Sequence, residues 1–176
     1  MGKGKNQKKM KRQNPKVPIS RTMNRVQAPK DEYLSISYRY FINQYFNEKK
    51  FNNHFKDSEH CGEFLHNVHL LLQELSSKKK SEILDRGYQS QMNIHPLKDK
   101  ALSIFFDIAS HLKQLDEGEI YQIKTNSVSN GRIIFYIQDN TIFILLYDPN
   151  HLLYRMDKYG AKESIKYSYS PVKSSS

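Results

Sequence analysis

Two cations and two aromatic residues near the C-terminal end of the chain are spaced so that they could bind RNA. Lys124, Arg132, Tyr136 and Tyr147 fall within three segments that alternate in the manner of β-strands. If these segments pair, alternation places all four side chains on one side of the sheet. Such a face suits single-stranded RNA, because aromatic rings stack on unpaired bases and cations hold phosphates. An ordinary half-exposed sheet carries similar residues on its outer face, so that interpretation stays open.

The three segments, residues 120–126, 132–138 and 141–147, are predicted to form an antiparallel meander. Asp139 and Asn140 tolerate a positive φ, which favours a two-residue hairpin between the last two strands. That turn places Gln138 opposite Thr141 and, counting back, Arg132 opposite Tyr147.

Alternation divides the predicted meander into two faces. One is apolar and is expected to pack on a helix; its residues are Tyr121, Ile123, Ile133, Phe135, Ile137, Ile142, Ile144 and Leu146. The other face carries Lys124 and Arg132. Burying these cations without partners would cost much free energy, so this face is expected to be open to solvent.

The segments before the meander supply the packing partners. Residues 33–40 alternate as a first strand, and a helix is predicted to begin at Asp57 or Ser58 with an apolar stripe from Phe64 to Leu75. A short second helix is expected over residues 81–86, ended by Gly87. Residues 94–99 are a predicted connector, and residues 101–112 fit either a buried strand or a helix. The fold class is therefore α+β: an antiparallel sheet with a three-stranded C-terminal meander packed on one or two helices.

The positive charge of the chain is concentrated at its N-terminal end. Of the 28 Lys and Arg residues, ten lie in residues 1–30, which hold no Asp or Glu; this leaves 18 basic and 18 acidic residues in the remainder. Residues 1–30 are predicted to be a disordered basic tail. It is either an arm that follows a phosphate backbone or a solubilising tail. The cations expected to contact RNA are Lys8, Lys9, Lys11 and Arg12. The domain is predicted to span residues 31–156, followed by a flexible tail over residues 157–176.

Several other classes of protein are not indicated by the sequence. There is no apolar run long enough for a membrane helix, no secretory signal, and a single cysteine, Cys61, so a cytoplasmic location is expected. No phosphate-binding glycine loop or serine hydrolase motif is present. Histidines at positions 54, 60, 66 and 69 lie near Cys61 but lack the spacing of known zinc sites, so no metal or other cofactor is predicted.

Four local motifs, taken in order, resemble the RelE-type toxin family over roughly residues 33–154. They are His95-Pro96-Leu97-Lys98, Tyr121-Gln122-Ile123-Lys124, Gly131-Arg132-Ile133-Ile134-Phe135-Tyr136 and His151-Leu152-Leu153-Tyr154. The chain departs from the family pattern at Gln122, where many members have a second lysine, and at Asp148-Pro149-Asn150, which interrupts the last strand and is most simply a tight turn.

The resemblance implies a metal-independent endoribonuclease that cleaves messenger RNA on the ribosome, as the toxin of a toxin–antitoxin pair. It implies that Lys124 is a base or charge stabiliser, that Arg132 grips the scissile phosphate, that His151 is the acid, and that Tyr154 stacks on a base or helps deprotonate the 2′-hydroxyl. Lys98 matches a lysine of the connector and is expected to contact RNA. Two alternatives remain: a non-catalytic RNA- or ribosome-binding protein on the same scaffold, and a protein-interaction module of a mobile element.

Overall fold

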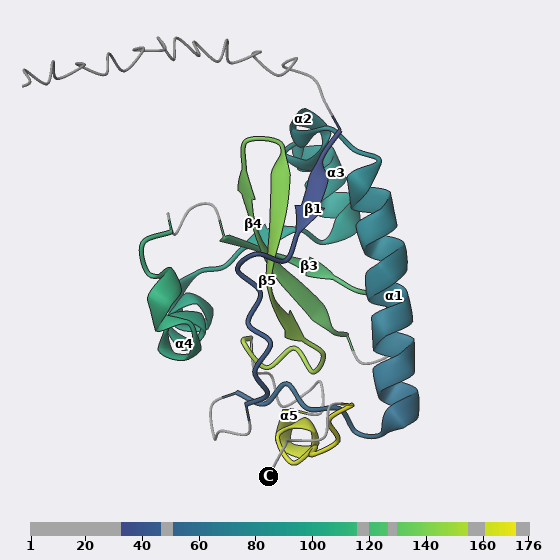
Figure 1. The fold of residues 1–176 in the computed structure, drawn as a ribbon, viewed down its shortest axis with the longest axis vertical. Coiled ribbons are helices and arrows are strands. Elements are labelled where there is room, and N and C mark those ends of the chain that lie inside the picture. The colour runs from purple at the N-terminus through teal and green to yellow at the C-terminus, as the bar shows by residue number, and fades with distance from the viewer. Residues whose placement is uncertain (1–32, 47–50, 116–119, 127–129, 155–160, 172–176) are drawn as a thin grey trace, which may run out of the picture.

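The protein has an α+β fold in which helices lie on both sides of one mixed sheet (Figure 1). The computed structural model describes residues 33–46, 51–115, 120–126, 130–154 and 161–171. The tail cations predicted to contact RNA lie outside these residues. The sheet has the strand order β1-β5-β4-β3-β2. Its strands are β1 (Ser35–Ser37), β2 (His95–Pro96), β3 (Ile120–Lys124), β4 (Arg132–Gln138) and β5 (Thr141–Asp148).

The predicted meander is present as β3, β4 and β5, with antiparallel pairing throughout. Gln138 pairs with Thr141 as predicted, and Asp139 takes a φ of 52° in the two-residue turn. The sheet as a whole is mixed, because β1 runs parallel to β5 and pairs Ser35 with Thr141. The short β2, inside the predicted connector, pairs with β3 at the opposite edge.

The predicted register fails beyond Phe135 because β5 contains an irregularity. Phe135 pairs with Ile144, but the next residue back along β4, Ile134, pairs with Leu146 and not with Leu145. A bulge of this kind adds one residue to a strand and reverses the face to which the following side chains point. Arg132 therefore lies opposite Asp148, where the sequence predicted Tyr147.

Helix α1 (Ser58–Ser76) covers one face of the sheet (Figure 1). It begins where predicted, and the side chain of its N-cap, Asp57, accepts a hydrogen bond from the His60 N–H at 2.9 Å. Most of the predicted stripe is buried in a cluster with the apolar face of the meander, but Leu65 is 42% exposed and Leu72 is only partly buried. The buried members from both elements are Phe64, Val68, Leu71, Leu75, Ile123, Ile133, Phe135, Ile137, Ile142 and Ile144. The bulge moves Leu146 out of this cluster and brings Tyr147 against it.

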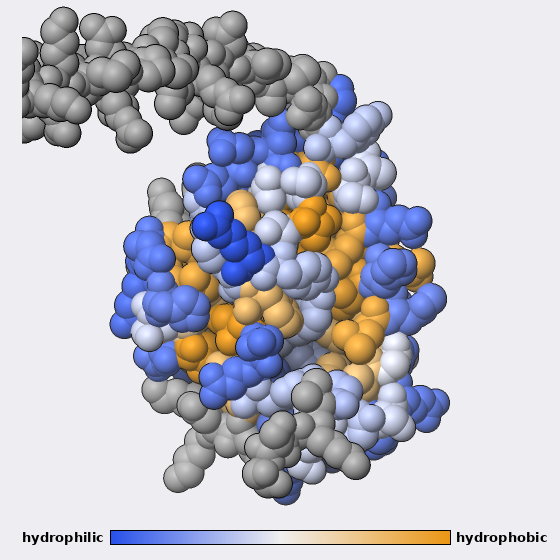
Figure 2. All heavy atoms as spheres, in the orientation of Figure 1, coloured by the Kyte–Doolittle hydropathy of each residue, from blue (hydrophilic) through white to orange (hydrophobic). Residues whose placement is uncertain are grey.

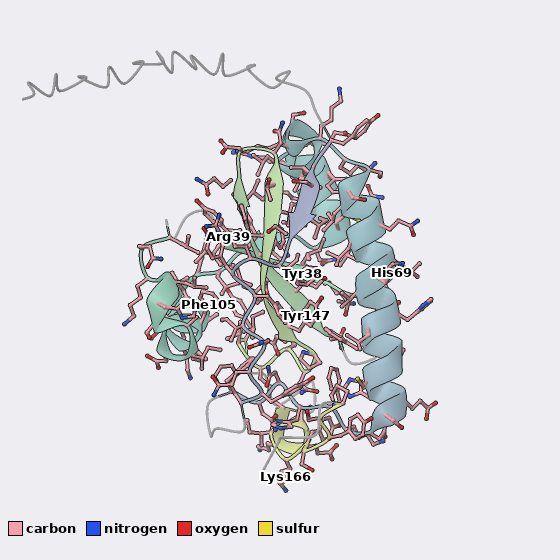
Figure 3. All side chains as sticks on the ribbon, viewed as in Figure 1. Tyr38, Arg39, His69, Phe105, Tyr147 and Lys166 are labelled. Atoms are coloured by element: carbon pink, nitrogen blue, oxygen red, sulfur yellow. The ribbon has the colours of Figure 1, made fainter. Side chains whose placement is uncertain are left out.

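The other face of the sheet is not open, contrary to the prediction. Helix α4 (Asp99–Ile108) lies on that side (Figure 1), and Phe105, labelled in Figure 3, is fully buried. The ambiguous residues 101–112 thus form most of a helix and a 3-10 turn (Ser110–Leu112), and they do not join the sheet. The second cluster under α4 includes Leu97, Ile104, Phe105, Ile120, Ile134, Tyr136, Leu145, Leu146 and Leu152. Burial of this cluster explains why the face carries Ile134 and Leu145.

Two short helices replace the predicted second helix. They are α2 (Lys80–Ile83) and α3 (Arg86–Met92), and Gly87 lies in the first turn of α3 instead of ending a helix. The side chain of Asp85 caps α3 by accepting from the Tyr88 N–H at 3.0 Å. Gly87 was wrongly predicted to end a helix because Asp85, two residues before it, is the N-cap of a new helix.

Part of the segment assigned from sequence to a flexible tail packs on the domain. Helix α5 (Ala161–Ser164) buries Ala161, and Tyr169 makes two backbone hydrogen bonds with Phe55. The buried side chain of Asn52 donates to the carbonyl oxygens of Ile165 and Tyr167, each at 2.8 Å. The domain therefore extends at least to Tyr169.

The surface alternates between polar and apolar areas. Figure 2 shows hydrophilic side chains along the outer side of α1 and apolar ones between this helix and the strands. In the described part of the chain, no helix is both long and apolar enough to cross a membrane.

Two glycines give opposite predictions for stability. A Cβ on buried Gly131 would lie 2.5 Å from a ring carbon of Phe64, whereas a Cβ on Gly62 in α1 would meet nothing within 4 Å. We expect Gly131→Ala to lower the free energy of unfolding by about 1–3 kcal/mol because the core becomes overpacked. The control Gly62→Ala should raise it by up to about 1 kcal/mol, because alanine favours the helix. Urea unfolding measures both, and equal effects would contradict the packing described.

Candidate functional site

The bulge in β5 gathers polar residues at one end of the meander. Lys124 pairs with Arg132 across β3 and β4, and Arg132 pairs with Asp148 across β4 and β5. Paired residues in a sheet point to the same side. Two cations and one carboxyl group therefore lie side by side at the adjacent ends of three neighbouring strands, on the side of the sheet that faces α4.

Asp148 shapes the loop that follows β5. Its carboxyl group is fully buried and accepts hydrogen bonds from the N–H groups of Leu152 at 2.8 Å and Leu153 at 3.0 Å. Burial raises the pKa of Asp148 to about 6, because the loss of hydration outweighs these hydrogen bonds and the positive charge of Arg132. The carboxyl group thus curls residues 149–153 back towards the sheet.

The curled loop carries His151 to the two cations. His151 has a φ of 55°, in the left-handed region, and its position follows from the turn that Asp148 holds. Burial, then the charges of Arg132 and Lys124, lower the pKa of His151 to about 4. At neutral pH the imidazole is therefore uncharged and has a nitrogen able to accept a proton.

Tyr154 and Lys98 complete the group. The Tyr154 hydroxyl accepts a hydrogen bond from the Lys98 N–H at 3.1 Å, and the Tyr154 ring centroid lies 6.1 Å from that of His151. A hollow of about 280 Å³ beside Tyr154 is lined by residues that include Lys98, Lys100, Ile104 and Leu153. The structure thus brings together five predicted site residues: Lys98, Lys124, Arg132, His151 and Tyr154.

The guanidinium of Arg132 is oriented by the preceding loop. Its Nη1 donates to the carbonyl oxygens of Asn130 and Gly131. Asn130 has a φ of 57°, a conformation that asparagine tolerates, so the backbone turns at this residue just before β4. The turn holds the arginine near the strand end.

Tyr136 and Tyr147 do not belong to this site, contrary to the prediction that both lie beside Lys124 and Arg132 on one open face. Tyr136 is only 8% exposed and lies in the core under α4, with its ring centroid 6.2 Å from that of Phe143. Tyr147 points to the α1 side, where its hydroxyl shares a hydrogen bond of 2.7 Å with that of Tyr38 (Figure 3). Tyr136 is buried because α4 covers its face of the sheet. Tyr147 lies on the α1 side because the bulge in β5 reverses the direction of its side chain.

Asp148 is the residue that the sequence analysis missed as a member of the site. It was interpreted as a turn residue, and the turn is present, but the carboxyl group also faces Arg132. The sequence did contain a signal for this role, because Asp148 directly follows a predicted apolar strand. An acid in that position is expected to be buried, and a buried carboxyl group needs hydrogen-bond donors or a cation nearby.

Of the histidines near Cys61, His60 packs at the start of α1, whereas His66 and His69 are exposed. The His60 Nδ1 accepts from the Lys56 N–H at 3.1 Å, and the ring lies edge-on to Phe55. Burial lowers the pKa of His60 and raises that of the Cys61 thiol. Among the described residues, no three His, Cys, Asp or Glu side chains are grouped in a way that could hold a metal ion.

The pKa of His151 tests the geometry of the site. We expect Lys124→Gln to raise it from about 4 towards the ordinary value of 6.5, because one of the two cations that oppose protonation is removed. An NMR titration of the His151 ring protons measures this pKa. Lys113→Gln, at an exposed lysine after α4, is the control and should leave it unchanged; an unchanged value in Lys124→Gln would place Lys124 away from the imidazole.

Asp148 and His151 should act in opposite directions on stability between pH 4 and 6.5. The raised pKa of Asp148 makes the folded state lose stability as pH rises through this range, whereas the lowered pKa of His151 makes it gain stability. We therefore expect wild-type protein to gain stability relative to His151→Asn as pH rises from 4 to 6.5. Asparagine suits the positive φ and does not titrate. Urea midpoints at pH 4.5 and 6.5 measure the difference, and a constant difference would contradict the assignment.

Comparison with known proteins places the chain in a family. The family model described as "Uncharacterised protein UU032" matches residues 37–176. A relative from Ureaplasma parvum serovar 3, "Uncharacterized protein UU032", is 26% identical over 169 residues, which cover 91% of this chain and 92% of that protein. No solved structure matches. Because the family model covers most of the chain, including every described strand but the first residues of β1, the protein belongs to the UU032 family.

Proposed function

We propose that the protein is a metal-independent endoribonuclease that cleaves messenger RNA at the ribosome, as the toxin of a toxin–antitoxin pair. The observation that carries this proposal is the meeting of Lys124, Arg132, His151 and Tyr154 at one end of the meander. These four residues were predicted from the sequence, and they come from three different segments: β3, β4 and the loop after β5. Their proximity is what a shared chemical task requires.

The order of the elements supports the same proposal. A first strand is followed by helices and then by a meander, and Tyr154 follows the last strand in a loop. This is the order on which the resemblance to RelE-type toxins rests. Helix α4, which covers the second face of the sheet, adds to that order and confines the proposed reaction to the strand ends.

The proposed reaction is attack of a ribose 2′-hydroxyl on the neighbouring phosphorus, which gives a 2′,3′-cyclic phosphate and a free 5′-hydroxyl. The neutral imidazole of His151 accepts the 2′-hydroxyl proton, because its pKa of about 4 favours the role of base over that of acid. Lys124 and Arg132 offset the charge that develops on the phosphorane oxygens. A bound phosphate would also offset these cations and so raise the pKa of His151, which makes it a stronger base when substrate is present.

Tyr154 has two roles in the proposal. Its ring lies near that of His151 and offers a surface for a base, and its hydroxyl keeps a hydrogen to donate while it accepts from Lys98. A hydroxyl so placed suits the 5′-oxygen that leaves. Because its substrate is messenger RNA on the ribosome, the proposed enzyme acts in the cytoplasm. The proposed antitoxin protein binds over the same strand ends.

A non-catalytic RNA-binding protein on the same scaffold is the second candidate. It is favoured because polar residues of the site make hydrogen bonds that stabilise the fold. Asp148 accepts from the backbone of the loop after β5, and Arg132 donates to the carbonyl oxygens of Asn130 and Gly131. Such a protein would retain RNA without cutting it, so cleavage separates the two candidates.

Substitution of Arg132 tests the proposal. Induced expression of the wild type should arrest growth and yield messenger RNA fragments with 2′,3′-cyclic phosphate ends, detected by end mapping. We expect Arg132→Gln to slow cleavage by roughly 10²- to 10³-fold, since one donor to the phosphorane is lost.

Arg86→Gln, at an exposed arginine that begins α3, is the matched control and should cleave at the wild-type rate. Intact messenger RNA at high wild-type expression, with RNA still retained on filters, would replace the enzyme with the second candidate.

A further inference from the structure

A second hollow lies on the opposite side of the sheet from the candidate site. It has a volume of about 190 Å³ and is bordered by four aromatic rings from three segments of the chain, Phe41, Tyr45, Phe55 and Tyr147. All four belong to or pack against the cluster between the sheet and α1. None of them takes part in the proposed reaction.

Two of the rings that border this hollow, Phe41 and Tyr147, are held in place by contacts with other aromatic residues. The rings of Phe41 and Tyr147 lie 4.8 Å apart between centroids, and Tyr147 also packs edge-on against Phe64 of α1 at 5.7 Å. Tyr38 contacts Phe41 edge-on at 5.5 Å and holds the Tyr147 hydroxyl (Figure 3). A flat ligand would therefore meet rings that do not have to reorganise, which lowers the entropy lost on binding.

The rim of the hollow carries three carboxamides. Asn53 is buried and uses its carboxamide for the fold: its Oδ1 accepts from the Phe46 N–H at 2.7 Å and its Nδ2 donates to the Gln44 carbonyl oxygen at 3.1 Å. Asn43 and Gln44 also line the hollow and are exposed. A carboxamide offers both a donor and an acceptor, which is the pattern that the edge of a nucleobase presents.

The hollow is joined to the loop of the candidate site. Asn150, next to His151, donates from Nδ2 to the carbonyl oxygens of His54 at 2.8 Å and Asn52 at 3.3 Å. These two residues flank Asn53 at the rim. The loop with the proposed base and the segment that borders the hollow are thus fastened to each other at the same end of β5.

We propose that this hollow binds one unpaired nucleobase of an RNA strand. Rings that stack on a flat ligand and the exposed carboxamides of Asn43 and Gln44, which can read its edge, match a nucleobase. The proposal names a substrate contact and so rests on the proposed function for the identity of the RNA, but base binding does not require cleavage.

NMR titration of the full chain with the four nucleoside 5′-monophosphates tests the pocket directly. We expect the ring resonances of Phe41, Tyr45 and Tyr147 to shift with at least one nucleotide and not with ribose 5-phosphate. Tyr45→Leu should weaken binding by about 5- to 150-fold, the usual effect of losing one stacking ring. Tyr33→Leu, at an exposed tyrosine on the N-terminal side of β1, is the control and should bind like the wild type.

Gln44→Ala keeps the test valid if Tyr45→Leu does not fold, because this exposed side chain can be removed without loss of core packing. It should weaken binding and change the preference among the four bases. Equal shifts with ribose 5-phosphate, or shifts with indole and none with nucleotides, would overturn the proposal. Cleavage without base binding would refute the pocket alone, whereas base binding without cleavage would refute only the proposed reaction.

Discussion

The burial of the Asp148 carboxyl group is the constraint on which the candidate site depends. A fully buried acid must receive hydrogen bonds, and Asp148 receives them from Leu152 and Leu153. This requirement bends the chain after β5 and places His151 beside Lys124 and Arg132. The same bend delivers Tyr154 to Lys98. A single carboxyl group thus places His151 and Tyr154 against residues from three other segments.

The position of Asp148 depends in turn on the irregularity in β5. Without the extra residue, Asp148 would point to the α1 side and Tyr147 would lie opposite Arg132. The irregularity therefore serves both faces, because it brings the acid to the cations and the tyrosine to the aromatic hollow. A local change in strand geometry that redirects side chains on both faces is a common device near functional sites.

Much of this arrangement follows from sequence, and the exceptions have physical causes. The α1 stripe, the Asp57 cap and the hairpin at Asp139 are local patterns, and the structure contains all three. The irregularity in β5 has no local signature, because Leu145 and Leu146 suit either face. The open face was predicted wrongly because Lys124 and Arg132 were taken to represent the whole face. They lie at strand ends, and the centre of that face is apolar and lies under α4. Long-range packing of this kind overrides local pattern.

The pairing of β1 with β5 has a consequence for the order in which the protein is made. Ser35 finds its sheet partner in Thr141, more than a hundred residues later, and the contact of Phe55 with Tyr169 spans a similar length. At translation rates of roughly 5–20 residues per second, β1 waits about 5–20 s before its partner strand is made. Contacts between such distant residues also form slowly once the chain is complete. The sheet that carries Arg132 and Asp148 thus gains its β1 edge only after β5 has been made.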